Sequence, residues 1–585
     1  MKRRHLHSVS DSSQAERQSS SVWSFSLCLL LGTHLAGAGE VLYNGIDLPA
    51  KWPPGRTRAD ILKYEPMPVP YLQNRPPVVP IDVGRQLLVD DFLVEQTTLT
   101  RRFHKAQPYS DNPILRPQKG WEVLARGYGM PEVTMAFSDG CFYDPKDKLF
   151  KIWYRSSVRM GTCYATSEDG IKWTRPAFDH LQPGSNIVQL SGSRDSSTVW
   201  LDLETTNPAE RFKLYQFHYA SYRPSVHTSP DGIHWSEATW GGPSKDRTTM
   251  FYNPFRKVWV FSIKNNAGTA PFQYSTKPYK PFIRARKYWE SKDFVSGIKW
   301  TGGADGPDWA PHEPQYWVGA DKLDGASFEG GRPELYNLDG APYESLMLGM
   351  FTVWYSGDRA NPDHPGQPKI NDVMLGFSRD GYHWHRPLRE SVVSVSNKPK
   401  TWNYGNVQSV GGGCLVVGDR LYMYHSGRNE TQDTTGLAFF RRDGFASMEA
   451  GTGGGTLTTR PVRFSGRHLF VNLDAPQGEL RVEVLDRDGK VIAPFTAANA
   501  NVVRGDKTLL KIDWKGGADL SRLAGQPVRF RFHLMIGALY AFWVSPESTG
   551  ASNGYIAAGG PGFTSNKDTV GTAAYEAAAR LPVVR

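Results

Sequence analysis

Short runs of aromatic and β-branched residues recur along residues 115–450. Each run follows a turn-rich segment such as "DPKDK" (144–148) or "NPFRK" (253–257). Runs of this length between turn residues are typical of β-strands, and their apolar character predicts burial between neighbouring sheets. The five runs are "FKIWY" (150–154), "FKLYQF" (212–217), "VWVFS" (258–262), "FTVWY" (351–355) and "LYMYH" (421–425).

A seven-residue phrase follows these runs at a nearly constant interval. Its aspartates are 62, 62, 87 and 63 residues apart. A fixed period with strand patterning predicts a β-propeller, and five copies predict five blades. The clear copies are "SEDGIKW" (167–173), "SPDGIHW" (229–235) and "SRDGYHW" (378–384), and the degenerate copies are "SKDFVSGIKW" (291–300) and "RRDGFAS" (441–447), with Asp169, Asp231, Asp380, Asp293 and Asp443 as the aspartates.

The phrase has the residues of a tight turn. We expect Asp-Gly to connect the outer two strands of each blade, with the Ser and Asp side chains bonding the turn amides and the Trp packing between blades. We favour this structural role over a catalytic role for these aspartates.

The chain outside the repeats also predicts β-structure. Alternating runs at 468–474, 479–486, 509–514 and 528–534 indicate a β-sandwich over 456–546. Residues 39–114 are expected to lead into the first blade, with a strand pair at 81–97. The Gly/Ala/Ser-rich residues 547–585 are expected to form a flexible tail. The predicted fold class is therefore all-β: a five-bladed β-propeller over 115–450 followed by the sandwich.

The first 38 residues resemble a secretion signal. A basic start is followed by the apolar stretch "SVWSFSLCLLLGTHLAGA" (21–38), which ends in the small-x-small pattern of a cleavage site. A membrane anchor is the alternative, but polar residues interrupt the run, which is shorter than the ~20 residues of a span. We expect a secreted or periplasmic protein with no membrane span after signal cleavage.

Charge and cysteine content narrow the possible partners. The formal net charge is +10, which favours binding to an acidic polymer or serves only to keep the protein soluble. The sequence has no basic run interleaved with aromatic residues that would indicate nucleic-acid binding. Three cysteines remain after signal removal, too few for a full disulfide framework, and no Cys/His spacing indicates a metal site. We therefore expect no cofactor.

The arrangement resembles the secreted five-bladed propeller glycoside hydrolases, the superfamily of families 32 and 43, including the invertase and levanase branch with a C-terminal sandwich. The resemblance covers roughly residues 80–546. It rests on blade number, the repeated phrases, and the stretches "DRTTMFYNPFRKVWVFS" (246–262), "YESLMLG" (343–349) and "RRDGFASM" (441–448). The Asn-Asp-Pro-Asn, Arg-Asp-Pro and Glu-Cys motifs of family 32 are absent. The resemblance implies carboxylates on the innermost strands around an axial pocket, and it allows a divalent cation in the axial channel.

Acidic residues precede the aromatic runs in four of the five repeats. Glycoside hydrolysis needs two carboxyl groups roughly 5–10 Å apart, so we looked for acids at the start of each innermost strand. Asp195 and Asp246 each lie seven residues before the residue that ends the strand, which gives them the same register. Each acid has a structural alternative as a turn, cap or salt-bridge residue. The candidates are Asp139, Asp195, Asp246, Glu334 and Glu344.

Residue type indicates the expected role of several of these candidates. Asp246 or Asp195 is the expected base or nucleophile, Glu344 the acid, and Arg247 an orienting residue. Glu334 and the aromatic residues Trp121, Tyr336 and Tyr404 are candidate substrate contacts, although most aromatic residues in such a propeller serve packing.

The hypothesis is a secreted glycoside hydrolase acting on an oligo- or polysaccharide at one mouth of the propeller axis. A non-catalytic glycan-binding propeller is the main alternative, and a protein-interaction scaffold is the third. The sequence leaves open the sugar, the linkage, exo or endo action, the stereochemical outcome and the oligomeric state.

Overall fold

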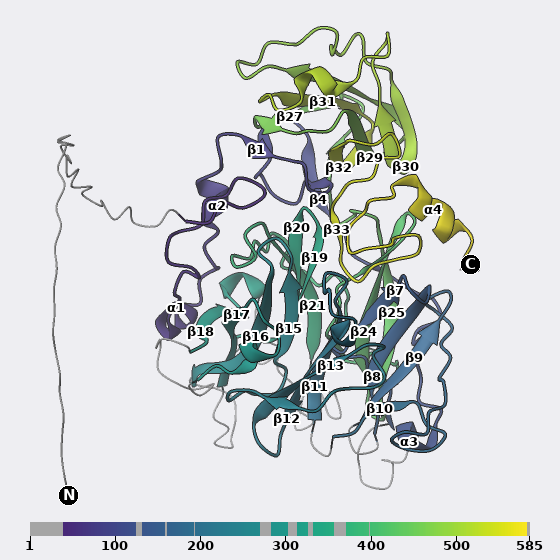
Figure 1. Ribbon diagram of the computed structural model, residues 1–585. Coiled ribbons are helices and arrows are strands. Elements are labelled where there is room, and N and C mark those ends of the chain that lie inside the picture. The colour runs from purple at the N-terminus through teal and green to yellow at the C-terminus, as the bar shows by residue number, and fades with distance from the viewer. Residues whose placement is uncertain are drawn as a thin grey trace, which may run out of the picture. The chain divides into compact units, whose positions relative to one another are not determined.

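The computed structural model describes residues 39–123, 132–157, 161–191, 194–269, 282–301, 313–325, 332–355, 370–396 and 398–581. The expected signal segment, 1–38, lies outside these ranges. Strands make up most of the secondary structure in them (Figure 1), and their few helices are all too short to cross a lipid bilayer. The all-β prediction is confirmed. The helices are α1 (Arg58–Leu62), α2 (Pro70–Gln73), α3 (Gly120–Val123) and α4 (Thr572–Ala579), with 3-10 turns at Pro208–Glu210, Ser296–Ile298, Lys322–Asp324 and Leu520–Leu523.

The first three repeats each form a four-stranded antiparallel sheet whose strands follow chain order. The predicted aromatic runs are the second strands of these sheets, and they are largely buried, as expected of strands packed between neighbouring sheets. The sheets contain β7 (Cys141–Asp144), β8 (Leu149–Arg155), β9 (Thr162–Ser167) and β10 (Ile187–Gln189); β11 (Arg194–Leu201), β12 (Phe212–His218), β13 (Arg223–Ser229) and β14 (Thr239–Trp240); and β15 (Thr249–Asn253), β16 (Val258–Thr269), β17 (Phe282–Ser291) and β18 (Gln315–Gly319).

The fourth and fifth repeats share one larger sheet. Its two halves join where Asn371 pairs with Asn406 in parallel, so the division into two blades remains a prediction from the repeat. An N-terminal strand pairs with β25 and completes the last repeat. The sheet contains β19 (Glu334–Glu344), β20 (Leu346–Trp354), β21 (Asn371–Ser378), β22 (Asn406–Gln408), β23 (Leu415–Val417), β24 (Arg420–Arg428), β25 (Gln432–Arg441), β5 (Gln107–Pro108), β6 (Glu132–Val133) and β33 (Tyr555–Ile556).

Consecutive repeats contact one another around an axis, and the last repeat contacts the first. Neighbouring first strands touch, β7 against β11, β11 against β15 and β15 against β19. The backbone amide of Phe137 donates to the hydroxyl of Ser426, which closes the ring between the first and fifth repeats. Such a closed ring of sheets is the architecture of a propeller, in which the first strands line the axis.

The repeated phrase forms the predicted turn. In all three clear copies the Asp carboxylate accepts the amides two and three residues later, and the Ser hydroxyl accepts the glycine amide. The indole of Trp153 in the first repeat donates to the carbonyl of Gly232 in the second, at 2.8 Å. Because a Cβ on Gly232 would lie 2.5 Å from that ring, and its φ is +79°, the position needs glycine.

A nine-stranded sheet forms the C-terminal β-region, seen at the top of Figure 1. Residues 86–103, expected to lead into the first blade, instead supply three strands to this sheet, because their apolar positions pack in its core. The sheet contains β2 (Gln86–Leu87), β3 (Val94–Thr97), β4 (Thr100–Phe103), β26 (Ala446–Ala450), β27 (Gly455–Thr459), β29 (His468–Leu485), β30 (Val503–Ile512), β31 (Arg529–Met535) and β32 (Gly537–Ser545), and β1 (Val79–Pro80) pairs separately with β28 (Val462–Arg463).

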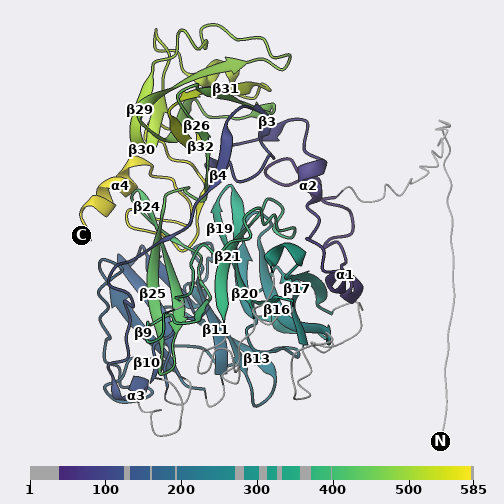
Figure 2. The same ribbon diagram turned by 180° about the vertical axis from the view of Figure 1, so that it is seen from behind.

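The expectation of a flexible tail after residue 546 is wrong for residues 547–581. This segment contains β33, labelled in Figure 1, which pairs with β19. It also contains α4, labelled in Figure 2, which contacts β23. Ser552 and Asp568 are buried, and both make polar contacts with the propeller strands or the segments that follow them. The small residues that suggested disorder instead allow close packing, since a Cβ on Gly560 would lie 1.9 Å from the Val416 carbonyl.

Candidate functional site

Charged side chains from three repeats gather where the first strands begin. We call Asp195, Asp246, Arg247, Glu334 and Tyr336 the axial cluster. Asp195 is the second residue of β11, Asp246 and Arg247 precede β15, and Glu334 and Tyr336 begin β19. Since the first strands line the axis, their starts converge at one end of it. The structure therefore brings together five of the sequence candidates: Asp195, Asp246, Arg247, Glu334 and Tyr336.

Arg247 lies at the centre of the axial cluster. Its Nε is 3.5 Å from Oδ2 of Asp195, and its Cζ is 3.9 Å from the Phe137 ring centroid and 5.2 Å from that of Tyr336. Burial alone would lower the pKa of Arg247, but Asp195, Tyr336 and Asp246 together outweigh it and raise the pKa. The guanidinium is therefore a permanent cation held between two rings.

The backbone around this guanidinium is strained. Arg247 has φ +63° and Phe137 has φ +48°, in the left-handed region that bulky residues rarely adopt. Strained conformations of this kind persist only where the surrounding structure imposes them, and they are frequent at functional sites.

Asp246 and Glu334 differ in accessibility and in protonation. The Asp246 side chain is 23% exposed, and its Oδ1 is 2.5 Å from Nζ of Lys264. The Glu334 side chain is only 6% exposed, and its Oε2 accepts from the amide and from Nη1 of Arg284, each at 2.8 Å. Burial raises the pKa of Glu334, against the opposing charge of Arg284. The cluster thus combines an accessible carboxylate beside a lysine with a buried acid that more readily keeps its proton.

Asp139 lies deeper and is fully engaged. Arg194 binds both of its oxygens, at 2.8 and 2.9 Å, and neither side chain is exposed. This pair joins the first and second repeats. The structure therefore supports the turn or packing role for Asp139 rather than contact with a substrate.

Asp339 is a buried acid on the innermost strand of the fourth repeat that the sequence analysis missed. It lies in the middle of β19, where its Oδ2 accepts from the amide of Val410 and from Nδ2 of Asn337. Burial raises the pKa of Asp339 to about 6. An aspartate next to Leu338 in a segment rich in apolar residues was the signal that could have identified it.

Glu344 is not part of the axial cluster, which overturns its pairing with Asp246 as a catalytic acid. It ends β19, ten residues after Glu334, and at ~3.3 Å per residue the two ends of the strand are roughly 30 Å apart. Glu344 is fully buried, 3.4 Å from Nε of Arg85 and 3.4 Å from Nη2 of Arg442. Its Oε2 also accepts from the hydroxyl of Ser552 at 2.7 Å.

Glu344 belongs to a second set of charged residues, which we call the buried ionic cluster. Asp443, expected to form a degenerate turn, instead lies there and accepts from Nη1 of Arg85, the hydroxyl of Tyr343 and Nδ2 of Asn472. The Asp443 carboxylate binds the buried guanidinium of Arg85 instead of the turn amides, because a charged donor forms the stronger hydrogen bond. The cluster consists of Arg85, Glu344, Arg442, Asp443 and Asp568.

Trp121 and Tyr404 lie outside the axial cluster. The Trp121 indole donates to Oδ1 of Asn186 and packs on the core of the first repeat. The backbone of Tyr404 pairs with Ser396 in the connection between β21 and β22. Over the described ranges, neither makes a hydrogen bond or ring contact with an axial-cluster residue. Their expected role as substrate contacts has no support in this geometry.

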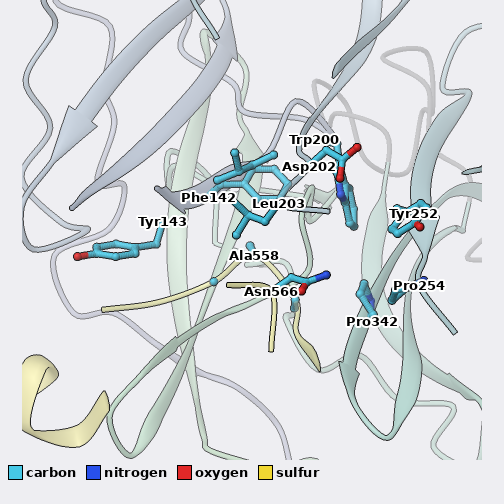
Figure 3. A pocket seen from close by; sticks show the side chains of 13 residues that line it. Phe142, Tyr143, Trp200, Asp202, Leu203, Tyr252, Pro254, Pro342, Ala558 and Asn566 are labelled. Atoms are coloured by element: carbon cyan, nitrogen blue, oxygen red, sulfur yellow. The ribbon is translucent and has the colours of Figure 1, made fainter. Parts of the chain in front are cut away.

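A small pocket lies at the opposite end of the first strands (Figure 3). Its lining includes Phe142, Trp200, Tyr252, Pro342 and Asn566, and its volume of about 20 Å³ has room for little more than one water molecule. It is too small for a sugar ring.

The axial acids do not suit the divalent cation that the resemblance allows. Asp195, Asp246 and Asp139 are paired with Arg247, Lys264 and Arg194 respectively. In the part of the chain that the structure describes, no three His, Cys, Asp or Glu side chains are grouped so as to hold a metal ion.

Comparisons of the chain with known proteins give similarity at the level of structure alone. No protein-family model matches the sequence, and no curated protein matches it. Among solved structures, an N-acetylgalactosamine deacetylase from F. plautii in complex with blood group B trisaccharide is 13% identical, with 58% of this chain and 94% of that chain covered and a TM-score of 0.37. A fructofuranosidase from Schwanniomyces occidentalis complexed with fructosylnystose is 10% identical, with coverage of 71% and 95% and a TM-score of 0.31.

A thermostable family-43 glycoside hydrolase is 9% identical, with coverage of 55% and 95% and a TM-score of 0.35. At these identities a function has to be argued from the residues of the axial cluster.

Proposed function

We propose that the axial cluster binds a carbohydrate and cleaves a glycosidic bond. The observation behind this proposal is the gathering of Asp195, Asp246 and Glu334, from three repeats, around Arg247 and Tyr336. Glycoside hydrolysis needs one protonated and one ionised carboxyl group on either side of the scissile bond. Two acids with different surroundings can supply these two protonation states, which supports the proposal.

The roles follow from the surroundings of each acid. Glu334 is the proton donor, because burial raises its pKa. Asp246 is the base or nucleophile, because it is the more accessible acid and has Lys264 beside it. Asp195 holds Arg247 in place. Arg247 and Tyr336 orient the sugar, with the ring supplying an apolar face and the guanidinium a hydrogen-bond donor.

Conservative substitutions test these roles. Glu334→Gln and Asp246→Asn retain side-chain shape but remove the proton donor and the ionised acceptor, so each lowers turnover at least about a hundredfold. The assay is release of reducing sugar from a panel of soluble polysaccharides. Asp231→Asn is the matched control, because Asp231 forms a partly exposed turn with Ile233 and His234 away from the axis. Normal hydrolysis by both axial variants would exclude this site.

Glycan binding without hydrolysis is the second candidate. It is favoured by the basic partner beside each acid of the axial cluster, since Arg247, Lys264 and Arg284 neutralise Asp195, Asp246 and Glu334. Binding requires only hydrogen bonds and ring contacts. A wild-type protein that binds a polysaccharide but releases no reducing sugar would establish this alternative.

We also propose that the protein is secreted or periplasmic, on the basis of the apolar segment at 21–38. N-terminal sequencing of the protein recovered outside the cytoplasm tests this, with a new terminus at Gly39 as the expected result. A retained Met1 terminus would contradict it.

A further inference from the structure

We propose that Tyr219 and Tyr222, in the turn after β12 of the second repeat, bind the rings of a soluble, flexible oligosaccharide chain. We call these two residues the aromatic platform. This inference rests on the proposed function for the class of ligand, and it adds a binding surface beside the axial cluster together with the kind of chain that fits it.

The two rings are exposed but held in place. Their exposed fractions are 39% for Tyr219 and 57% for Tyr222. Both rings pack edge-on against buried Phe217, with centroids 5.2 and 6.0 Å away. Clustered exposed aromatic rings mark interaction sites, because each presents an apolar face and a polar edge. The C–H faces of sugar rings match such apolar faces.

The backbone of Tyr222 gives a second, independent observation. Its φ is +50°, in the left-handed region that glycine or asparagine adopts with less strain. Burial does not explain the tyrosine, since the residue stays 57% exposed although its ring touches Phe217 and Tyr219 edge-on. Strain retained by so exposed a side chain indicates that it serves a function.

The platform adjoins the axial cluster through backbone pairing. His218 pairs with Arg194 across β12 and β11, so the turn at 219–222 begins beside the strand start that contains Asp195. The amide of Ser244 donates to the carbonyl of Tyr222 at 3.0 Å, which ties the same turn to the segment leading to Asp246. A glycan unit at the axial cluster can therefore continue onto the platform.

The angle between the rings selects the kind of glycan. The planes of Tyr219 and Tyr222 are inclined at 82°, with centroids 6.3 Å apart. A flat crystalline polysaccharide face requires coplanar rings, whereas a chain whose successive units turn relative to one another can contact both. The platform thus fits a soluble chain of several units.

Affinity electrophoresis tests the platform in a Glu334→Gln background, which prevents turnover during the run. The gels contain soluble xylan, arabinan, mannan or levan. Tyr222→Gly is expected to weaken the affinity about tenfold, the scale of one lost aromatic contact. Its melting temperature should be unchanged or higher, because glycine accepts the backbone conformation without strain. Tyr222→Phe, which keeps the ring face, should retain the affinity.

The outcomes separate the platform from the hydrolytic activity. Reduced binding by Tyr222→Gly together with no reducing-sugar release by the wild type leaves the platform standing and overturns hydrolysis. Equal binding by Tyr222→Gly and its parent overturns the platform, whether or not the wild type hydrolyses glycan. So does the absence of retardation by all four polysaccharides. Pull-down of the parent by microcrystalline cellulose overturns the assignment to soluble chains.

Discussion

The axial cluster and the buried ionic cluster lie at opposite ends of β19, and both are built from acids and arginines. In the buried ionic cluster, Arg85, Glu344, Arg442 and Asp443 have no exposed surface. In the axial cluster, Asp246 keeps 23% of its side chain exposed and Asp195 keeps 12%. The presence of partly exposed acids, rather than the number of charges, therefore distinguishes a site for a ligand from one that joins parts of the protein.

The acids of the two clusters also differ in their hydrogen-bond partners. Oε2 of Glu344 accepts from the Arg85 amide and from Ser552, while Asp443 has three side-chain donors. Asp195 has a 3.5 Å ion pair with Arg247, longer than a good hydrogen bond. Backbone strain does not separate the clusters, since Glu344 has φ +50° and Arg247 has φ +63°. Saturation with internal partners indicates a structural role.

Removing one cation from the buried ionic cluster should produce the largest effect. Arg442→Met leaves Asp568, 2.8 Å away in the wild type, without its buried partner. Breaking a buried pair in this way costs about 3–5 kcal/mol of unfolding free energy. Urea denaturation measures the change, and turnover per folded molecule should be unaffected.

Lys264→Met is the matched change in the axial cluster, where Asp246 remains accessible to water. It should cost less than about 1 kcal/mol of stability, but it should reduce turnover at least about tenfold, through misplacement of Asp246. The comparison fails if Lys264→Met destabilises the protein as much as Arg442→Met does.

Asp339 gives a pH-dependent test of burial near the axis. Burial raises its pKa from 3.8 to about 6, so the folded state binds the proton more tightly than the unfolded state. The contribution of this group to stability is therefore full below about pH 4 and is lost as pH rises to about 6. At 1.36 kcal/mol per unit, the loss amounts to at most ~3 kcal/mol.

The Asp339→Asn variant cannot ionise and should lack this loss. We expect the difference in unfolding free energy between variant and wild type to shift in favour of the variant between pH 4 and pH 7. Urea denaturation at both pH values measures it. A difference that is constant with pH would show that Asp339 does not titrate in this range.

A single added methyl group tests the packing around Glu344. In Gly554→Ala the new Cβ would lie 2.0 Å from Oε2 of Glu344 and 2.5 Å from Cα of Gly84, so the backbone has to move. The expected cost is about 1–3 kcal/mol. Gly453→Ala is the control, because nothing lies within 4 Å of its added Cβ. Equal melting temperatures for the two variants would contradict the tight packing around Glu344.

The sequence predicted those parts of the protein that depend on local chemistry. The Ser-x-Asp-Gly turns at Asp169, Asp231 and Asp380 formed as expected, because the side chains bond amides only two or three residues away. The aromatic runs formed buried strands because aromatic and β-branched residues between turns favour a strand through their own local chemistry. The register shared by Asp195 and Asp246 also predicted two residues of the axial cluster, because equivalent positions in a repeat face the same axis.

Tertiary structure alone decided which acids meet and where the terminal segments pack. Glu334 and Glu344 lie in one strand, and nothing local shows that its two ends face different surroundings. The partners of Glu344 come from Arg85, Arg442 and Ser552, which are 259, 98 and 208 residues away in the chain. The Gly/Ala/Ser-rich segment 547–581 became ordered because β19 and β23 offered it a surface that its own composition does not reveal. Such long-range contacts depend on how segments outside the repeats pack against β19 and β23, which no local pattern in the chain specifies.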